Sequence, residues 1–338
     1  MKLSVIIPVY NVAEEILCRC LQSALDIRNI KTEILLVLDG TDIRIQELPS
    51  VSRLISEAKG RIKVLAKEHE GVSAARNYGM YHAEGKWLFF LDADDRICGG
   101  ALEKGIETGE REHADLIVMD YRTETNGSQK AHRYGEEKTE IPWKTFLREV
   151  LKPETGMGVV WAKLFRREWL DIYGVTFQTA LYTAEDTEFM LRSSLCRPKV
   201  WYVPECSYGY CYNPQSAVRK YRKNLADGYI SAMKSIRRDL EKSGRAEEFG
   251  QEYDNCVLYH LLLIAVNCSF HPDNPYSGRK RRKRFQRLLE EPVFRESLAH
   301  VQLGAFSPVR RAALICVKMR LYRGMELIAA VRHWQLRH

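Results

Sequence analysis

Two carboxylates, Asp92 and Asp94, stand one residue apart and directly follow the apolar run 87–91 (WLFFL). Hard divalent cations such as Mg²⁺ and Mn²⁺ prefer carboxylate and phosphate oxygens as ligands. A cation held on this turn can also contact a diphosphate and neutralise the charge of a departing nucleotide. A solvated acidic turn would carry the same residues, but an expected strand directly before the pair favours the metal-binding interpretation.

A second acidic pair, Glu185 and Asp186, precedes the segment 187–191 (TEFML). If Phe189 and Met190 face a core, the acidic pair opens a helix, whose N-terminal dipole favours negative charge. The alternative is a general base that takes a proton from an acceptor hydroxyl group. The residue types and their spacing leave both interpretations open.

Single polar residues elsewhere also allow a structural explanation. Asp39 lies before Gly40 and fits a simple turn. Arg76 and Asn77 fit ordinary positions on a helix surface, and His69 fits a structural loop position better than a ligand position. The sequence has no G-x-x-x-x-G-K-[ST] loop and no G-x-G-x-x-G fingerprint, which excludes those two nucleotide-binding motifs.

Strand and helix patterns alternate through the first third of the chain. Apolar runs predict strands at 3–9, 33–38, 61–65, 86–91 and 114–119. Helical spacing predicts helices at 16–25, with Asn11 as the N-cap, and at 72–83. This alternation is typical of a mostly parallel sheet with helices on both faces, and such sheets bind ligands at the carboxyl ends of their strands. Tyr10, Asp39 and Asp92 are expected there.

The remaining chain is predicted to be loop and helix. Residues 121–142 are polar and predict a loop, and short elements are expected from there to residue 214. Helices are predicted at 221–243, 247–269, 279–291 and 308–336. Polar residues interrupt the apolar stretch 257–268, which therefore predicts a buried helix and not a membrane span.

Composition excludes several classes of protein. With 45% hydrophobic and 28% charged residues, the chain has the composition of a globular protein. Its first residues lack the apolar run and cleavage pattern of a signal peptide. Nine cysteines, an odd number with no C-x-x-C pair, argue against a disulfide scaffold or a zinc site and predict reduced thiols in a cytoplasmic protein.

The positive charge of the chain is concentrated near its end. Residues 279–338 hold 15 Lys and Arg against 4 Asp and Glu, a net charge of +11, whereas the whole chain carries +8. The run 279–284 (RKRRKR) and the mixed basic and apolar pattern of 308–336 predict a cationic amphipathic surface that binds an anionic membrane. The alternative is a helix that packs its apolar face on the preceding part of the protein. No nucleic-acid-binding module accompanies the charge, so nucleic acid is not an expected partner.

Several short motifs of the sequence resemble those of a known family. Four segments are similar, in order and spacing, to successive motifs of the family 2 glycosyltransferases: 4–11 (SVIIPVYN), 39–42 (DGTD), 71–79 (GVSAARNYG) and 90–95 (FLDADD). The resemblance is strong over residues 1–120. It continues more loosely to about 215 through 161–165 (WAKLF), 185–189 (EDTEF) and 208–216, and it says little about 220–338.

The resemblance implies a GT-A fold, an α/β Rossmann-like mixed sheet flanked by helices, followed by a mainly helical C-terminal region. The implied catalytic domain is 1–215, with nucleotide-sugar binding in 1–120 and the acceptor side in 121–215. Residues 216–338 form the helical basic region.

The family resemblance also implies roles for single residues on the donor side. Pro8, Val9 and Tyr10 would line the nucleobase pocket, and Asp39 would hydrogen-bond the base, usually uracil. Arg76 would contact the nucleotide. In this sequence Leu38 replaces an aspartate that commonly precedes the Asp39 position, and the loop is one residue shorter, although Asp39 itself is retained.

The remaining implied roles concern the metal and the catalytic base. Asp92 would lie near the ribose, and Asp94 of this D-x-D motif would coordinate Mn²⁺ or Mg²⁺ on the diphosphate. Asp186 would be the catalytic base, and Glu185 would help to shape the acceptor site.

The resemblance therefore implies an inverting, metal-dependent hexosyltransferase that uses a nucleotide sugar, usually a UDP-sugar. Its expected acceptor is a glycan, polyprenyl-diphosphate-linked, in bacterial capsule, exopolysaccharide or O-antigen synthesis. The expected location is the cytoplasm, peripherally on the inner face of the plasma membrane, and the C-terminal apolar face could pair two subunits as a homodimer. Alternatives are a nucleotidyltransferase and a catalytically inactive, nucleotide-sugar-binding scaffold of a synthesis complex.

Overall fold

The computed structural model describes residues 2–40, 47–125, 128–153, 155–212 and 221–337. Thr41 and Asp42 of the second motif, and residues 213–216 around the expected domain boundary, lie outside the described residues. The chain divides into two compact units. The first comprises Met1–Val150 and Met157–Asn213, and the second comprises Leu151–Gly156 and Pro214–His338.

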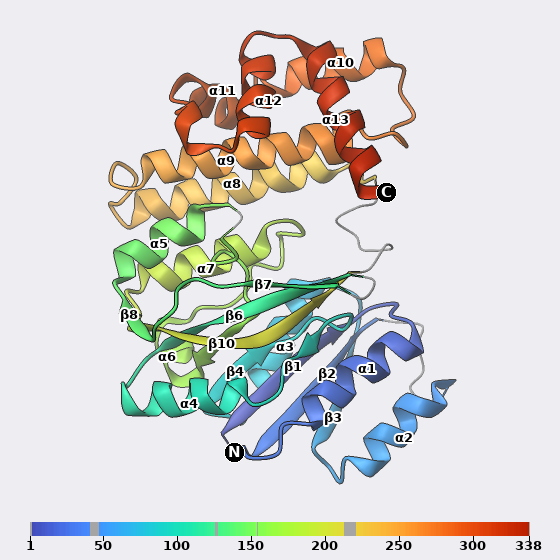
Figure 1. The fold of residues 1–338 in the computed structure, drawn as a ribbon, viewed down its shortest axis with the longest axis vertical. Helices are drawn as coiled ribbons and strands as arrows, with labels where there is room; N and C mark the ends of the chain where they lie inside the picture. Colours follow the sequence, from blue (N-terminus) through green and yellow to red (C-terminus); the bar gives the residue numbers. More distant parts are fainter. Residues whose placement is uncertain (1, 41–46, 126–127, 154, 213–220, 338) are drawn as a thin grey trace. The chain divides into compact units, whose positions relative to one another are not determined.

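Within the described residues, the first unit contains a mixed sheet of ten strands (Figure 1). The strands are β1 (Leu3–Val9), β2 (Thr32–Asp39), β3 (Ile62–Lys67), β4 (Trp87–Phe90), β5 (Arg96–Ile97), β6 (Leu116–Thr125), β7 (Ser128–His132), β8 (Thr139–Ile141), β9 (Lys163–Arg166) and β10 (Val200–Cys211). They pair in the order β3-β2-β1-β4-β9-β6-β10-β5, with β7 beside β6 and β8 beside β10. The first four strands of this order are parallel, whereas β9 runs antiparallel to both of its neighbours.

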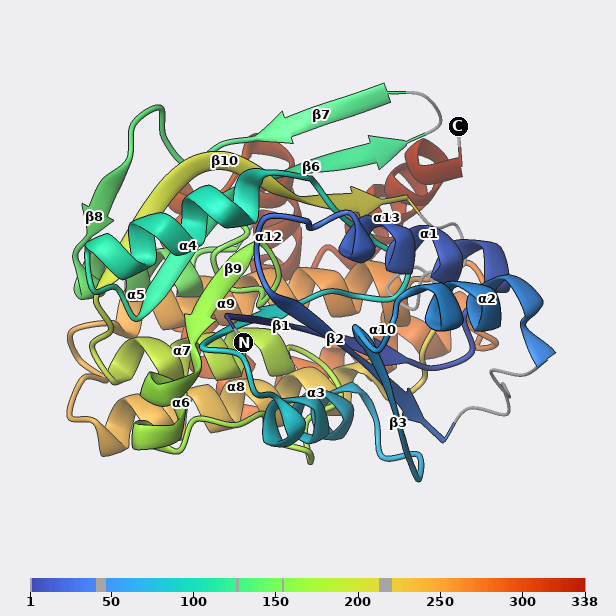
Figure 2. The same ribbon diagram turned by 90° about the horizontal axis from the view of Figure 1, so that it is seen from below.

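Helices cover both faces of the sheet. In the first unit they are α1 (Glu14–Leu25), α2 (Pro49–Glu57), α3 (Val72–His82), α4 (Ala101–Arg111), α5 (Trp143–Leu151), α6 (Arg167–Tyr173) and α7 (Glu185–Leu195). Successive side chains of a strand point to opposite faces. Val5 and Ile7 of β1 accordingly join the core under α1, α2 and α4, and Ile6 joins the core under α3, α5, α6 and α7. Figure 2 shows α1 and α4 on one face and α3 and α7 on the other.

The structure confirms the predicted mixed α/β fold and corrects three local predictions in the first unit. In the second half of the sheet β6 and β10 pair in parallel, but the other pairs are antiparallel, so the expectation of a mostly parallel sheet holds for the N-terminal half only. Residues 121–142 are not a loop, because β6 continues to Thr125 and β7 and β8 follow it. Asn11 is not the N-cap of α1. Its φ is 48°, and Ala13 occupies the cap position.

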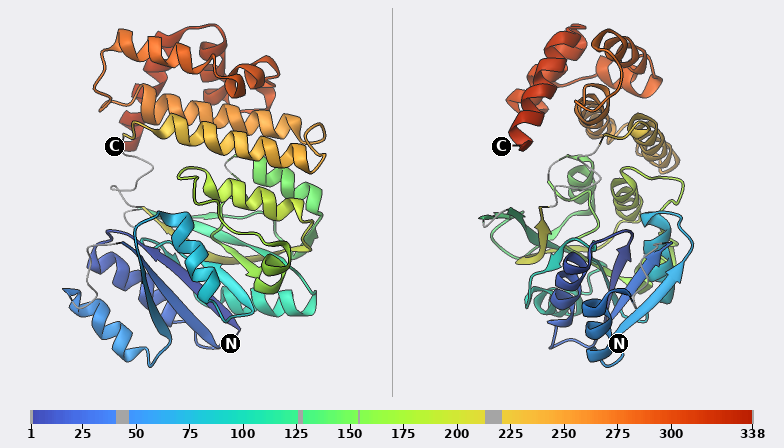
Figure 3. Two further views of the ribbon diagram at one scale, coloured as in Figure 1. Left: turned by 180° about the vertical axis from the view of Figure 1, so that it is seen from behind. Right: turned by 90° about the vertical axis from the view of Figure 1, so that its right-hand side faces the viewer.

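The second unit consists of helices among the residues described (Figure 3). They are α8 (Leu225–Lys242), α9 (Gly250–Ile264), η2 (Ala265–Ser269), α10 (Gly278–Leu288), α11 (Pro292–Ala299), η3 (Leu303–Ala305), α12 (Pro308–Lys318) and α13 (Tyr322–Arg337). α9 contains the apolar stretch predicted as a buried helix, and it contacts α8, α11 and α12. Throughout the described part of the chain, no helix has both the length and the apolar character needed to cross a membrane.

The prediction of one long helix over 308–336 is wrong. The helix breaks between α12 and α13, where Arg320 has a φ of 58° and the Leu321 amide donates to the Cys316 carbonyl at 2.7 Å. The backbone therefore leaves the helical path for one turn, and α13 packs back against α12 and η2. The short helix α11 was not predicted from the sequence.

Candidate active site

Three parallel strands of the first unit end side by side. β1 pairs with β2 on one side and with β4 on the other, in parallel register. Their carboxyl ends therefore lie at one edge of the sheet, with Tyr10 after β1, Asp39 as the last residue of β2 and Asp92 shortly after β4. This is the edge at which open α/β sheets bind ligands.

Asp39 is buried, and its carboxylate accepts three hydrogen bonds from the protein. Oδ1 accepts from the Lys67 ammonium at 3.0 Å and from the Glu70 amide at 3.1 Å. Oδ2 accepts from the Gly71 amide at 2.8 Å and lies 2.9 Å from His69 Nδ1. Burial alone would raise the pKa of Asp39, but the two amides and the ammonium outweigh it and lower that pKa. Asp39 thus fastens the segment before α3 to the end of β2.

The aromatic side chain at this end of the site is Tyr10. Tyr10 is 50% exposed, and its ring stacks on that of His69, with centroids 4.2 Å apart and planes at 18°. Pro8 is half-buried, and Val9 is buried in the core, so Val9 offers a ligand only its backbone. His69, which the sequence favoured as a structural loop residue, joins Tyr10 to Asp39.

Arg76 of α3 gathers the acidic residues of the other end of the site. Its buried guanidinium donates to Asp92 Oδ1 at 2.9 Å and to Asp186 Oδ1 at 2.5 Å, and it lies 3.5 Å from Glu185 Oε1. The pKa of Arg76 is raised: burial opposes its charge, but the carboxylates of Asp186, Asp92 and Glu185 outweigh burial. Arg76 Nε has no hydrogen-bond partner among the described residues. Arg76, which was predicted to contact the nucleotide, therefore lies between Asp92, predicted to lie near the ribose, and Asp186, the predicted catalytic base.

Asp186 lies at the start of α7, as expected from the interpretation in which the acidic pair opens a helix. Its side chain keeps 17% of its surface exposed, and Oδ2 lies 3.5 Å from the Val160 amide. Burial raises the pKa of Asp186 to about 7, with Arg76 opposing the rise and the negative charge of Glu185 adding to it. A carboxylate with such a pKa is suited to general-base work near neutral pH. The two interpretations of the pair are compatible, because the first turn of α7 positions the candidate base.

Lys163 of β9 is a buried charged residue that sequence reasoning did not single out as functional. Its ammonium donates to the Trp161 carbonyl at 3.4 Å, and burial lowers the pKa of Lys163 to about 7, with the charge of Asp186 opposing. The signal was a lysine within the otherwise apolar segment 161–165. Lys163 adds a second titratable group near neutral pH to the surroundings of Asp186.

A third aspartate, Asp95, links the D-x-D turn to β10 through hydrogen bonds. The Tyr208 hydroxyl donates to Asp95 Oδ2 at 2.6 Å, and the Cys211 amide donates to Oδ1 at 2.7 Å. The Asp92 amide donates in turn to the Tyr208 hydroxyl at 3.3 Å. Burial, together with the negative charges of Asp92 and Asp94, raises the pKa of Asp95 to about 8. β10 therefore supports the turn that carries the predicted metal ligand.

The carboxylate oxygens of Asp92 and Asp94 provide only part of the ligand set that a hard cation needs. Asp94 is half-buried and Asp92 is engaged by Arg76. Across the residues that the structure describes, no group of three or more His, Cys, Asp or Glu side chains is arranged to hold a metal. Two carboxylates suit Mg²⁺ or Mn²⁺ if further oxygens come from outside the protein, such as those of a diphosphate. The metal role of Asp94 stays a prediction.

The chain is similar to several proteins of one family. Residues 4–174 match the family described as Glycosyl transferase family 2. The putative glycosyltransferase EpsH of Bacillus subtilis (strain 168) is 26% identical over 342 residues, covering 97% of this chain and 94% of EpsH. The succinoglycan biosynthesis protein ExoO of Rhizobium meliloti (strain 1021) is 24% identical over 249 residues, covering 72% of this chain and 70% of ExoO.

Solved structures agree at the level of the fold. The crystal structure of S. aureus TarS 1-349 superimposes with a TM-score of 0.68 at 18% identity, covering 99% of this chain and 92% of that chain. The same protein in complex with UDP-GlcNAc gives a TM-score of 0.67 at 18% identity. Because the family match spans half of the chain and includes the strand-end aspartates and Arg76, this chain belongs to glycosyltransferase family 2 and is a glycosyltransferase with a GT-A fold.

Proposed function

We propose that this glycosyltransferase moves a sugar from a UDP-sugar to a hydroxyl group of a glycan acceptor, with inversion at the anomeric carbon. The observation that carries the proposal is the contact of Arg76 with Asp92 on one side and with Asp186 and Glu185 on the other. A one-step displacement needs a base close to the donor, and a single guanidinium joins these two parts of the site. The TarS complexes with UDP and with UDP-GlcNAc support a UDP-sugar as the donor.

In this mechanism Asp186 accepts the proton of the acceptor hydroxyl group. The acceptor oxygen attacks the anomeric carbon from the face opposite the nucleotide, and the bond from that carbon to the diphosphate oxygen breaks. Arg76 keeps a fraction of Asp186 ionised near neutral pH, because its positive charge opposes the rise in the pKa of Asp186 that burial causes. Glu185 helps to shape the acceptor side. Positioning and charge stabilisation supply most of the acceleration.

The donor end of the site is assigned to the residues at the strand ends. Pro8, the backbone of Val9 and the ring of Tyr10 would border the nucleobase. Asp39 accepts from the Lys67 ammonium and from the Glu70 and Gly71 amides, which leaves acceptor capacity on its carboxylate for a hydrogen bond from uracil. Asp94, with Asp92, would hold Mn²⁺ or Mg²⁺, which when bound supplies positive charge for the leaving diphosphate.

Donor binding and slow donor hydrolysis test the proposal directly. We expect thermal stabilisation and cleavage with one UDP-sugar from a panel of UDP-, GDP- and dTDP-sugars, in the presence of Mn²⁺ or Mg²⁺ and not of EDTA. Asp186→Asn should keep the donor-induced stabilisation and lower kcat by about 10²–10⁴-fold. Asp171→Asn, a surface substitution of the same type on α6, is the matched control.

The outcomes separate the alternatives. An Asp186→Asn enzyme that turns over like the parent would remove Asp186 from the mechanism. Donor binding by the parent without any turnover, with candidate acceptors present, would favour the scaffold. Formation of a new nucleotide sugar from a sugar phosphate would favour a nucleotidyltransferase.

We further propose that the acceptor is lipid-linked and that the second unit holds the enzyme at the inner face of the plasma membrane. More than half of the exposed large apolar side chains among the described residues lie on or beside α12 and α13: Val309, Ile315, Met319, Leu321, Leu327, Val331 and Trp334. Basic residues alternate with them along the same helices. Apolar and cationic side chains on one pair of helices suit an anionic bilayer surface. The succinoglycan function in the name of ExoO supports an acceptor in polysaccharide synthesis.

Part of the basic run in α10 has a structural role instead. Arg281 donates to the Tyr276 carbonyl at 2.6 Å and to the His271 carbonyl at 3.2 Å, and Arg282 pairs with Glu326 of α13 at 2.6 Å. These contacts stabilise the second unit, so the membrane proposal rests on α12 and α13 more than on this run. A homodimer that covers the same apolar side chains is the competing use of this surface.

A further inference from the structure

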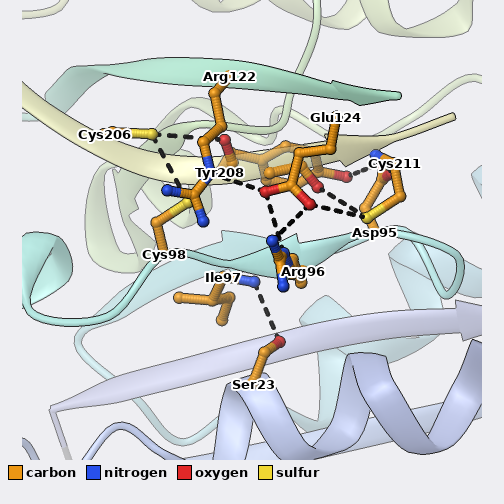
Figure 4. A network of polar contacts seen from close by, with 11 residues as sticks. Ser23, Asp95, Arg96, Ile97, Cys98, Arg122, Glu124, Cys206, Tyr208 and Cys211 are labelled. Carbon is orange, nitrogen blue, oxygen red and sulfur yellow. Dashed lines mark hydrogen bonds and ion pairs between the residues drawn. The ribbon is translucent and has the colours of Figure 1, made fainter. Parts of the chain in front are cut away.

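Two cysteines from distant parts of the sequence meet beside the D-x-D turn. Cys98 directly follows β5, and Cys206 lies in the part of β10 where the pairing register shifts. Their sulfur atoms are 3.5 Å apart (Figure 4). The Cys98 amide donates to the Ser207 carbonyl at 3.0 Å. Both thiols are free. The backbone therefore already holds the two sulfur atoms in contact.

The Cys98–Cys206 pair borders a cavity and lies near the positively charged side chain of Arg122. A cavity of about 540 Å³ is lined by Cys98, Cys206 and Arg122. The hydrogen bond shared with Cys98 lowers the pKa of Cys206 to about 7, and the Arg122 guanidinium favours the thiolate further. The same hydrogen bond and burial raise the pKa of Cys98. A thiolate beside an arginine in an accessible cavity has the surroundings of a reactive cysteine, and the neighbouring thiol is placed to resolve its oxidised form.

We propose that Cys98 and Cys206 form an oxidisable dithiol that a hydroperoxide converts to an intramolecular disulfide. The Cys206 thiolate attacks one peroxide oxygen, the O–O bond breaks, and hydroxide leaves, which forms a sulfenic acid. The Cys98 sulfur then attacks the Cys206 sulfur, the S–O bond breaks, and that oxygen leaves as water with the Cys98 proton. Each sulfur gives up one electron, and each of the two peroxide oxygens gains one.

The disulfide would also change the positions of residues on the donor side of the site. A disulfide requires the sulfur atoms to approach to about 2.05 Å, which draws the segment after Asp95 toward β10. Tyr208, two residues after Cys206, holds Asp95 through its hydroxyl group and accepts from the Asp92 amide. Formation of the disulfide would therefore displace Tyr208 and Asp95, which support the D-x-D turn. This coupling rests on the proposed function, whereas formation of the disulfide does not.

Mapping the thiols of the intact protein tests the disulfide without any variant. The fully reduced chain is treated with hydrogen peroxide, remaining thiols are blocked with N-ethylmaleimide, and unreduced peptides are analysed by mass spectrometry. We expect two of the nine thiols to be lost and a single cross-linked peptide pair that contains Cys98 and Cys206, both reversed by dithiothreitol. Both thiols intact, or Cys206 joined to another cysteine, would overturn the proposal. Cys98→Ser should abolish the cross-link, and Cys316→Ser is the control that should keep it.

Donor affinity tests the coupling. The oxidised protein should bind its UDP-sugar about tenfold more weakly than the reduced protein, and dithiothreitol should restore the affinity. Cys98→Ser should bind equally well before and after peroxide. Equal affinity of the reduced parent and the cross-linked parent would overturn the coupling. If the reduced protein binds no nucleotide sugar, the proposed function fails while the thiol mapping still decides the disulfide.

Discussion

At the scale of single residues, Arg76 sets the charge balance of the site. Three carboxylates surround its buried guanidinium, so the arginine compensates charge that would otherwise be repulsive. The pKa of Asp186, raised to about 7 by burial, would rise further without it, because Arg76 is the positive charge that opposes the rise. The activity of the enzyme near neutral pH is therefore expected to depend on a residue that is not itself the base.

Arg76→Met should move the pH dependence of kcat to higher pH. Loss of an adjacent opposite charge raises a carboxyl pKa by ~1–3 units, so the ionised base would appear only at higher pH. The measurement is kcat against pH at saturating donor and acceptor. Arg53→Met, at an exposed position of α2, is the control and should leave the profile in place. An unchanged midpoint in Arg76→Met would show that Arg76 does not act through Asp186.

Asp95→Asn should become increasingly stabilising as the pH rises. The folded-state pKa of Asp95 is raised to about 8 by burial and neighbouring charge, whereas an unfolded aspartate has a pKa of about 3.9. The stability that this group contributes is therefore fully present below the unfolded pKa and is lost as the pH rises toward about 8. Asparagine does not titrate and can serve both Tyr208 and the Cys211 amide.

Thermal unfolding of Asp95→Asn and the parent at several pH values gives the measurement. Between about pH 5 and pH 8 the difference in unfolding free energy should shift in favour of the variant by an amount on the order of 1–3 kcal/mol. Asp171→Asn should show a difference that does not depend on pH. A constant difference for Asp95→Asn as well would mean that Asp95 is ionised throughout this range.

At the scale of elements, the turn after β2 and the segment before α3 have to approach closely. Gly40 has a φ of +59°, and a Cβ atom built on it would lie 2.4 Å from the backbone nitrogen of His69. Glycine is required here by both the backbone conformation and the contact. This approach lets Asp39 accept from the Gly71 amide, directly before the helix that carries Arg76.

Gly40→Ala should destabilise the protein more than Gly60→Ala does. Gly60 also has a positive φ, +80°, but a Cβ atom added there would meet nothing within 4 Å, so its substitution costs only the backbone strain of about 1–2 kcal/mol. Gly40→Ala adds a backbone clash and should also weaken donor binding through Asp39 and His69. Thermal unfolding and donor titration of both variants provide the test. Equal melting temperatures would show that the turn can relax around the added methyl group.

At the scale of the whole molecule, the two units carry different kinds of residues. The first unit contains every residue assigned to the donor, the metal and the base. The net positive charge of the chain lies in the second unit, mainly in residues 279–338, and this unit also has exposed apolar side chains on α12 and α13. This division supports the proposal that the first unit carries out catalysis and the second unit holds the enzyme at a membrane. The membrane proposal depends on residues of the second unit alone.

Leu327→Glu should weaken binding to vesicles that contain phosphatidylglycerol. Leu327 of α13 is 66% exposed, so the substitution leaves the packing of the unit intact and places a negative charge against the anionic surface. Cosedimentation should show affinity about tenfold weaker, and binding by the parent should fall with added salt. Ile172→Glu, at a position 72% exposed on α6, is the control. A parent that binds no vesicles but sediments as a dimer would assign this surface to a second copy.

Much of the fold and part of the site could be predicted from the sequence, because they depend on local patterns. Buried parallel strands need continuous apolar runs, so β1, β2 and β4 and the acidic residues at the ends of β2 and β4 were recognisable. The helix that begins at Glu185 was visible in the same way, since an acidic pair before an apolar stretch is typical of a helix start.

Only the tertiary structure decided which of these residues meet. Arg76 and Asp186 are 110 positions apart, and Cys98 and Cys206 are 108 positions apart, so no local pattern relates them. The antiparallel insertion of β9 between β4 and β6 brings Lys163 into the core, and the irregular part of β10 carries Cys206 to β5. Burial then determines the pKa values of Asp186, Lys163 and Asp95, because it depends on how many distant segments exclude water from each group. The sequence by itself determined the strands β1, β2, β3, β4 and the first part of β6, the acidic residues at strand ends and the family resemblance. The other strands, the pairing of the strands and the protonation of the acidic residues required the folded chain.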